Sequence, residues 1–283
     1  MNKRNETSAP FRTLLVLLCG FSLLGFGKAF PETVRESERI VVLTFDDAVK
    51  SHRQFVAPLL KRMGFGATFF VTHYWMNDSE NFMTWNEIAE IHEMGFEIGN
   101  HSWTHADFSQ PKNAARLAEE LKQVEVELER VGVPRPISFA YCGNGFGPEA
   151  VLGLKKLGYR LARRGMQPEV PYGKIQAGPT FDPLKHHPLL IPTTGDAYPG
   201  WTLEHFRSVV DRAGMGQIVI LQFHGVPDPQ HPWVTTSVEV FKQFMNFLKE
   251  NKFQVVALRD IEPLLPKIGP ADPLLAIRYP PQK

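Results

Sequence analysis

Two adjacent carboxylates follow an apolar stretch near residue 45. The segment 41–47 reads VVLTFDD, so Asp46 and Asp47 stand where a buried strand would end. Two like charges side by side in a partly buried site are costly unless a cation neutralises at least one of them. The pair therefore indicates a metal centre. The alternative is structural, because Asp47 could cap a helix that begins near Val49.

Histidines follow two further apolar stretches. The segment EIGNHSWTH ends in His101 and His105, four residues apart, so one helical turn would place both on the same side. The segment QIVILQFHG delivers His224. Neutral imidazoles suit a borderline divalent metal. Each histidine taken alone could equally be a satisfied structural residue.

Taken together, the three apolar stretches indicate one common site. If they are strands of one parallel barrel, their carboxyl ends meet at the same rim. One aspartate and two histidines leave coordination positions open for water and a substrate oxygen, as a hydrolytic site requires. The other aspartate is then free to act as a base.

The elements that must position these residues alternate along the chain, which is typical of an α/β fold. We predict strands over residues 40–45, 67–72, 97–100, 137–141, 159–163, 217–223 and 253–258. We predict helices over residues 52–63, 84–94, 111–131, 148–157, 202–213 and 236–251. This order favours a distorted (β/α) barrel of about seven parallel strands. In the third helix Leu117, Leu121, Val124 and Leu128 form an apolar stripe, and its charges are expected to face solvent.

Two segments lack such periodicity. Residues 167–200 are rich in Pro and Gly and are expected to form a long loop over one end of the barrel. Residues 266–283 form a Pro-rich tail that is expected to pack loosely. His186, His187 and His231 stand in Pro-rich surroundings, so we expect them in turns rather than in a second metal site.

The N-terminal stretch is typical of a secretory signal peptide. Basic residues precede the apolar run LLVLLCGFSLLGFG, and small residues stand near Ala29. We expect residues 1–29 to be removed, which would export the mature protein to the periplasm, the cell envelope or the medium. The run is short for a membrane span. A retained membrane anchor, or a lipid anchor on Cys19, is the alternative.

Removal of that segment changes the composition. It carries four basic residues and one acidic residue, so the formal net charge would fall from +1 to −2. Such a charge does not point to nucleic acid. Cys142 would remain as the only cysteine, which excludes an internal disulfide in the mature chain. The length of 283 residues and the apolar fraction of 43% allow a sizeable core.

With these residues the sequence resembles the polysaccharide deacetylases with a NodB homology domain, also called carbohydrate esterase family 4. The resemblance covers roughly residues 39–263, within a domain expected over residues 30–265. TFDD is similar to the first motif of the family, which implies Asp46 as the catalytic base and Asp47 as a metal ligand.

Two other segments carry the resemblance further. HSWTH is similar to the second motif and implies His101 and His105 as metal ligands. LQFH is similar to the last motif and implies that Leu221 lines the acetyl pocket and that His224 is the general acid. The family also implies one divalent metal ion, with zinc first and cobalt, nickel, manganese or iron as alternatives.

The sequence departs from the family pattern in two places. In SFAYCGNG, Ala140 stands where many members have an arginine that holds the catalytic aspartate, and Gly143 is our choice for the oxyanion-binding amide. In YRLARRG the family often has tryptophan and aspartate. Arg163 or Arg164 could reach Asp46 instead, although either could be an exposed surface charge.

The function implied is that of a metal-dependent hydrolase that removes acetyl groups from an N-acetylated glycan, with xylan O-acetyl groups as another substrate in the family. Tyr74, Trp75, Trp103 and Trp201 could present flat faces to sugar rings, or could simply pack at the rim. Two other functions stay open. One is hydrolysis of a non-glycan C–N bond, as in allantoinase-like members, and the other is carbohydrate binding without catalysis on the same scaffold.

Overall fold

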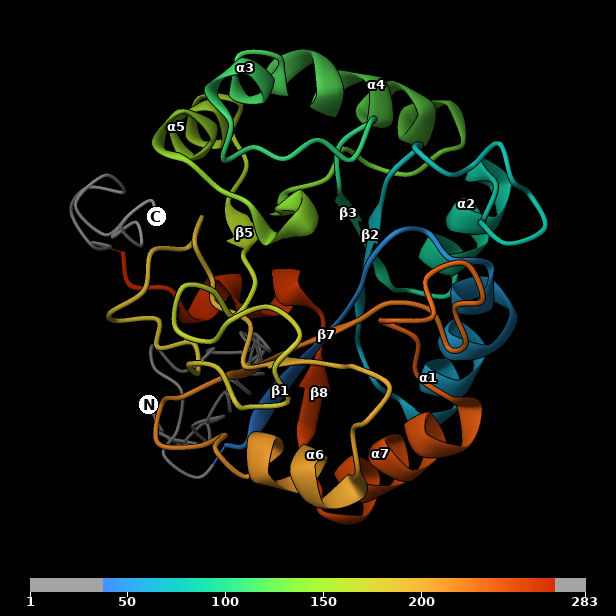
Figure 1. Ribbon diagram of the computed structural model, residues 1–283, viewed down its shortest axis with the longest axis vertical. Helices are drawn as coiled ribbons and strands as arrows, with labels where there is room; N and C mark the ends of the chain where they lie inside the picture. The colour runs from blue at the N-terminus through green and yellow to red at the C-terminus, as the bar shows by residue number, and fades with distance from the viewer. Residues whose placement is uncertain (1–37, 268–283) are drawn as a thin grey trace, which may run out of the picture. The chain divides into compact units, whose positions relative to one another are not determined.

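The computed structural model describes residues 38–267 (Figure 1). In chain order the elements are β1 (Ile40–Phe45), η1 (His52–Val56), α1 (Ala57–Met63), β2 (Thr68–Val71), α2 (Trp85–Glu93), β3 (Glu97–Asn100), α3 (Pro111–Ala114), α4 (Leu117–Arg130), β4 (Ser138–Ala140), η2 (Cys142–Asn144), α5 (Pro148–Lys156), β5 (Leu161–Arg163), β6 (Gly195–Asp196), α6 (Leu203–Val210), β7 (Val219–Phe223), α7 (Val238–Glu250), β8 (Gln254–Val256) and η3 (Leu258–Leu264). The expected signal peptide, residues 1–29, and nearly all of the expected tail lie outside the described residues. Within residues 38–267, no helix combines the length and the apolar character needed to cross a bilayer.

The strands form one parallel sheet, as predicted. Its order is β5-β4-β3-β2-β1-β7-β6, and β8 pairs with the first half of β1, at residues 40–42. β2 pairs with the last two residues of β1, Thr44 and Phe45, and β7 pairs with β1 over residues 41–45. The α/β class and the distorted barrel are thus confirmed, and each of the seven predicted strands is present.

The segment 167–200 is more than a loop. It contains β6, which pairs with β7, and shortly before that Ile191 bridges to Arg163 of β5. Backbone hydrogen bonds continue on both sides, from Arg164 N to Ile191 O over 2.9 Å and from Thr194 N to Ile220 O over 2.8 Å. The segment therefore connects the two edges of the curled sheet. The segment pairs because β5 and β7 offer it free backbone groups, and it has no alternating apolar pattern of its own. For this reason the sequence did not predict β6.

The sheet separates two apolar layers. Val42, Ile220 and Leu161 belong to the cluster inside the curled sheet. Alternate residues such as Val41 and Leu221 belong to the larger cluster between the strands and the helices. Figure 1 shows the helices outside the strands, so the strands are covered on both faces, as their continuous apolar character predicted.

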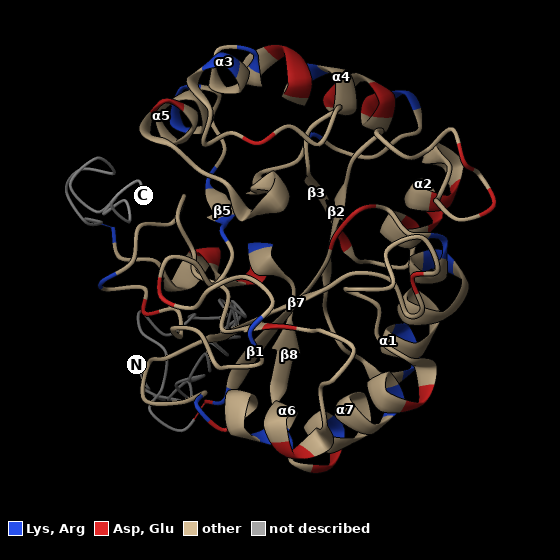
Figure 2. Ribbon diagram, in the orientation of Figure 1, with Lys and Arg blue, Asp and Glu red and all other residues tan. Residues whose placement is uncertain are grey.

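The predicted helix over residues 111–131 is divided. Residues 115 and 116 separate α3 from α4, and the predicted stripe of α4 is buried against the sheet. Its acidic residues do not all face solvent, because Glu120 is only 2% exposed. Elsewhere Lys and Arg alternate with Asp and Glu along the outer helices (Figure 2).

Candidate active site

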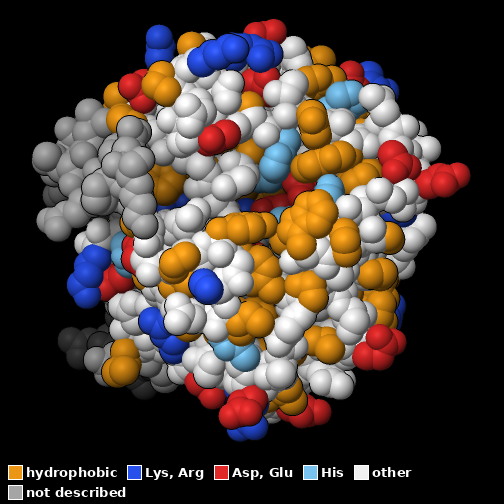
Figure 3. Space-filling model, in the orientation of Figure 1, with side chains coloured by type: hydrophobic (Ala, Val, Ile, Leu, Met, Phe, Trp, Pro, Cys, Tyr) orange, Lys and Arg blue, Asp and Glu red, His pale blue; other side chains and the backbone are white. Residues whose placement is uncertain are grey.

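The strand ends deliver their polar residues to one hollow, as the barrel prediction required. Asp46 and Asp47 follow β1, His101 follows β3 and His224 follows β7. They line a pocket of about 320 Å³. In Figure 3 carboxylates lie at the bottom of this hollow, and histidines and apolar side chains border it.

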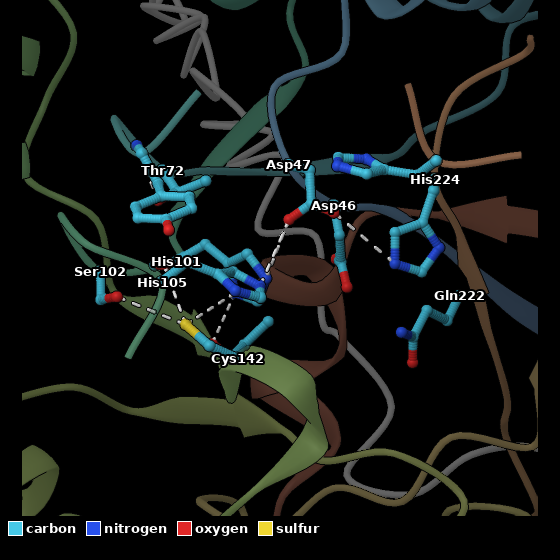
Figure 4. Close-up of polar contacts among 12 residues, drawn as sticks. Asp46, Asp47, Thr72, His101, Ser102, His105, Cys142, Gln222 and His224 are labelled. Carbon is cyan, nitrogen blue, oxygen red and sulfur yellow. Dashed lines mark hydrogen bonds and ion pairs between the residues drawn. The ribbon is translucent and has the colours of Figure 1, made fainter. Parts of the chain in front are cut away.

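The Nε2 atoms of His101 and His105 both lie close to one oxygen of Asp47. The Oδ1 atom of Asp47 lies 3.5 Å from Nε2 of His101 and 3.5 Å from Nε2 of His105. A tetrahedral ion with bonds of about 2.0–2.1 Å would hold its ligand atoms about 3.3–3.4 Å apart. Among the described residues Asp47 Oδ1 is also buried with no hydrogen-bond partner of normal length. These three residues therefore fit a divalent metal ion (Figure 4).

The two imidazoles are prepared to act as ligands. Nδ1 of His101 lies 2.8 Å from the carbonyl oxygen of Ala140 and donates to it, so Nε2 is the ring nitrogen that faces Asp47. Burial lowers the pKa of His105 from 6.5 to about 4, so its ring is neutral near pH 7. Burial alone would raise the pKa of Asp47, but His101, His105 and His224 beside it hold that pKa well below its ordinary value.

The backbone is strained where these side chains are presented. Asp47 has a φ of 74°, Ser102 a φ of 59° and His105 a φ of 52°. Left-handed conformations are uncommon for residues other than glycine, and they concentrate at functional sites that the surrounding structure holds in place. Asp47 is not the cap of η1, because Ser51 occupies the N-cap position of that helix.

Buried side chains hold the turn that carries the histidines. Oδ1 of Asn100 accepts a hydrogen bond from Ser102 N over 2.9 Å. Both carboxylate oxygens of Glu120 accept from Thr104, over 2.8 Å from its N–H and 2.9 Å from its hydroxyl. Glu120 thus fixes the turn between His101 and His105 from α4. Sequence reasoning assigned this residue to a solvated face, and only its position beside the apolar stripe could have drawn attention to it.

Cys142 supplies a second combination of donors. Its Sγ can group with nitrogen atoms of His101 and His105, all within 4.8 Å of one another. However, its contact with His101, at 3.8 Å, is to Nδ1, the nitrogen that already faces the Ala140 carbonyl. The thiol also lies 3.3 Å from the Ser102 hydroxyl. We therefore favour Asp47 over Cys142 as the third ligand.

Asp46 is paired with an arginine. Nη2 of Arg163 donates to Oδ2 of Asp46 over 2.5 Å, and Nη1 of the same residue donates to the side chain of Gln222. Arg163 is fully buried. Arg164 turns the other way and forms a bidentate pair with Glu169, over 2.8 and 2.7 Å. Of the two candidates, Arg163 is the one that reaches Asp46.

Gln222, and not Leu221, belongs to the pocket. Side chains alternate along β7, so Gln222 lies on the same face as His224 and lines the pocket. Leu221 points to the other face and packs in the outer apolar cluster. The expectation for Leu221 was wrong because it ignored this alternation. A glutamine in an otherwise apolar strand was the signal that could have identified the correct position.

His224 stands on the other side of Asp47. Its Nε2 lies 3.8 Å from Asp47 Oδ2, and its backbone oxygen lies 3.0 Å from Nε2 of the buried His52. Within residues 38–267 its Nδ1 has no hydrogen-bond partner. Asp196, from β6, is a further buried carboxylate near this histidine. Burial raises the pKa of Asp196, and the charge of His224 opposes that rise.

Of the remaining predicted residues, Gly143 and Trp75 line the pocket and two tryptophans do not. Gly143 lines the pocket with a φ of 56°, next to the site as expected. Trp75 also lines the pocket. Trp103 does not, because its ring stacks on His73 with centroids 3.9 Å apart. Trp201 is buried in the outer apolar cluster.

Of the three histidines that we expected in turns, two stabilise turns away from the pocket and one lines it. Nδ1 of His186 accepts from Asp182 N over 2.9 Å, and Nδ1 of His187 accepts from Leu189 N over 3.0 Å, so both stabilise turns. His231 lies in a turn as well, but it lines the pocket. Proximity in space, and not local sequence, brings His231 to the pocket.

Comparisons with known proteins agree with this arrangement. A family model for polysaccharide deacetylase matches residues 33–162, which include Asp46, Asp47, His101 and His105. An uncharacterized 30.6 kDa protein of Geobacillus stearothermophilus is 26% identical over 126 residues, which are 44% of this chain and 45% of that protein. The match thus spans less than half of that relative.

Solved structures share the fold at low identity. A peptidoglycan N-acetylglucosamine deacetylase gives a TM-score of 0.55 at 15% identity, with 80% of this chain and 88% of that chain covered. A family 4 carbohydrate esterase from Bacillus subtilis gives 0.52 at 20% identity, covering 81% and 84%. A family 4 pseudoenzyme from Bacillus anthracis gives 0.54 at 17% identity, covering 81% and 66%. The family match over residues 33–162 and the shared fold agree with the resemblance of this chain to the polysaccharide deacetylases of carbohydrate esterase family 4.

Proposed function

We propose that this protein is a metal-dependent hydrolase that removes acetyl groups from an N-acetylated glycan. One observation carries the proposal. Nε2 of His101 and Nε2 of His105 each lie 3.5 Å from Oδ1 of Asp47 in the pocket, and Asp46 lies beside them in a buried pair with Arg163. Ligands and a proton acceptor are thus present together, which a purely binding protein would not need.

The donor set supports one divalent ion held by Asp47, His101 and His105. One carboxylate and two imidazoles suit zinc first, and cobalt, nickel, manganese or iron next. When bound, the ion would polarise the acetyl carbonyl and lower the pKa of a water molecule.

Asp46 is placed to accept a proton. Arg163 occupies its Oδ2, while its Oδ1 is buried and, among the described residues, accepts no hydrogen bond. The pairing fixes the orientation of the carboxylate, and the free oxygen is left for the attacking water. A positioned base of this kind contributes typically about 10²- to 10⁴-fold to a rate.

His224 is placed to return a proton to the sugar nitrogen. An amine leaves poorly until it is protonated, so the reaction needs an acid on the side of the leaving group. His224 comes from a different strand than Asp46 and lines the same pocket, which allows the two groups to address different atoms of one substrate. The N–H of Gly143, at the pocket wall, would stabilise the developing oxyanion, and one such donor is worth about 3 kcal/mol elsewhere.

Two features support a glycan substrate. Tyr172 and Trp233 line the pocket and are 53% and 59% exposed, so flat apolar faces are available to sugar rings. A structural relative is a peptidoglycan N-acetylglucosamine deacetylase. We also propose export after removal of residues 1–29, which would bring the protein to extracellular or cell-envelope glycans.

The test is acetate release from a panel of acetylated glycans. The metal-stripped mature protein is assayed with and without zinc or cobalt, beside an Asp46→Asn variant. Acetate that depends on metal and disappears in the variant supports the proposal. Glycan binding with no acetate under any metal would instead identify a non-catalytic binding protein, and no response to any glycan would favour a non-glycan C–N substrate.

A further inference from the structure

A second histidine is built into the pocket wall. His231 is 8% exposed and lines the pocket, and its Nδ1 lies 3.1 Å from Oδ2 of Asp228, which is 1% exposed. The other oxygen of Asp228 accepts from His231 N over 3.0 Å and from Gln230 N over 3.2 Å. The carboxylate therefore fixes both the backbone and the ring of this histidine.

The pairing decides which ring nitrogen is available. A carboxylate only accepts hydrogen bonds, so Nδ1 of His231 carries a hydrogen and donates it to Asp228. Nε2 is left for a ligand in the pocket. In the neutral ring it accepts a hydrogen bond, and in the protonated ring it donates one, so a hydroxyl group can pair with it in either state.

One indole separates His231 from the metal-ligand cluster. The ring centroid of Trp75 lies 4.8 Å from that of His105 and 4.7 Å from that of His231. Trp233 follows at 5.3 Å from His231, at the exposed edge of the pocket. A ligand with its acetyl group at His105 would place its next ring beside Trp75 and His231.

The chemistry of this wall fits an uncharged sugar. Apolar aromatic faces with a few placed polar groups are the usual lining of a small-molecule site. Among the described residues that line the pocket, none is Lys or Arg. His231 is not placed as a ligand of the same ion, because the ring of Trp75 lies between it and His105.

We propose that His231, oriented by Asp228, is a substrate-binding residue that hydrogen-bonds a hydroxyl group of an uncharged N-acetylated sugar while Trp75 and Trp233 cover its apolar face. This inference rests on the proposed function and specifies its substrate. An acidic sugar would find no cationic partner in this wall beyond the histidine itself, whose charge Asp228 already balances.

The test measures binding, so that it does not depend on turnover. The zinc-loaded Asp46→Asn protein is titrated with chitin tetramer by calorimetry, and His231→Ala is then added to that background. Loss of one hydrogen bond should weaken binding about tenfold, which corresponds to about 1.4 kcal/mol. Asp228→Ala should lose most of the affinity, and Asp228→Asn, which keeps one acceptor oxygen where the carboxylate uses two, should lose less.

His205→Ala is the matched control. This histidine also packs against a tryptophan, Trp201, with ring centroids 4.8 Å apart, but it does not line the pocket. Its variant should bind the tetramer as the parent does. The affinity for zinc should be unchanged in every variant.

The outcomes separate the two proposals. Equal binding with and without His231 overturns the role of His231 and leaves the deacetylase proposal standing. Loss of zinc in His231→Ala would also overturn it, because the residue would then support the metal site. If no acetylated glycan binds the parent protein, both proposals fail. Tighter binding of a carboxylate-bearing glycan than of chitin tetramer would refute the uncharged substrate.

Discussion

Arg163 of β5 donates a hydrogen bond to Oδ2 of Asp46 over 2.5 Å, and the two side chains are 0% and 3% exposed. The β4–β5 pairing places Arg163 directly opposite Ala140, the position at which many family members have an arginine. The guanidinium thus reaches the carboxylate from the neighbouring strand at the same level. The arginine that pairs with Asp46 therefore comes from β5, in register with Ala140 of β4.

The first prediction concerns this pair. Arg163→Ala should lower kcat by about 10- to 100-fold, because Asp46 loses the group that orients it. It should also lower the free energy of unfolding by about 3–5 kcal/mol, since a buried carboxylate is left unpaired. Metal content should stay at one ion per chain, because none of the three proposed ligands is touched. The measurements are steady-state kinetics, denaturant unfolding and metal analysis.

Arg164→Ala is the control for that experiment. Arg164 is adjacent in sequence, but its partner is Glu169, at the protein surface. Its loss should change kcat little. Equal losses in the two variants would mean that the Asp46 contact does not matter for turnover.

The second prediction distinguishes the neighbouring carboxylates. Asp47→Asn should weaken zinc affinity strongly, because it removes a charged ligand from a cluster with 3.5 Å spacings. Asp46→Asn should retain zinc and lose turnover by about 100-fold or more. Zinc titration against a competing chelator gives the affinities, and acetate release gives the turnover.

Cys142→Ser decides between the two possible donor sets. Since Cys142 faces the nitrogen of His101 that is bonded to Ala140, the variant should bind zinc as the wild type does. A large loss of affinity in this variant, with Asp47→Asn unaffected, would assign the third ligand to the thiol.

The third prediction concerns the support of the histidine turn. Glu120→Gln should weaken zinc affinity by about 10- to 100-fold, the range typical for residues that orient metal ligands. The amide offers only one acceptor oxygen where Thr104 uses two. Glu119→Gln changes the same charge on the exposed neighbour and should leave the affinity intact. An equal effect of both changes would point to helix charge and not to the turn.

The fourth prediction concerns pH. Burial among Phe45 and Phe69 lowers the pKa of His52 from 6.5 to about 4. Between these values the unfolded chain binds a proton that the folded protein does not, so the free energy of unfolding falls as the pH is lowered through this window. The contribution of His52 is about 3 kcal/mol over the whole window.

His52→Gln tests the assignment. The amide can still donate to the His224 carbonyl, which lies 3.0 Å from Nε2 of His52, and it does not titrate. Denaturant unfolding at several pH values between 4 and 7 should therefore show a shallower pH dependence in the variant. A dependence of the same slope in both proteins would place the titration elsewhere, for example at His105, whose lowered pKa acts in the same direction.

Much of the site could be predicted from the sequence. Asp46, Asp47 and His224 directly follow apolar runs, His101 follows the next predicted strand, and His105 stands four residues after it. Because parallel strands deliver their carboxyl ends to one rim, local sequence was enough to bring these residues together. The seven strands were found for the same reason, since buried strands form continuous apolar runs.

The other residues of the site depended on tertiary structure. Whether Arg163 or Arg164, and Gln222 or Leu221, faces the pocket is set by which face of a strand lies inside the sheet, and a shift of one residue reverses it. Glu120 reaches the site from α4 only because that helix packs beside the histidine turn. No local pattern records such an approach.

The loops show the same limit. In the segment 167–200, Ile191 hydrogen-bonds to β5, and β6 pairs with β7. His231 reaches the pocket through a buried pair with Asp228. The sequence by itself determined the strands, their rim and the metal-ligand candidates, because these follow from residues adjacent in the chain. Tertiary structure decided which arginine pairs with Asp46, that His231 lines the pocket and that Glu120 holds the histidine turn, because each depends on contacts between residues far apart in the chain.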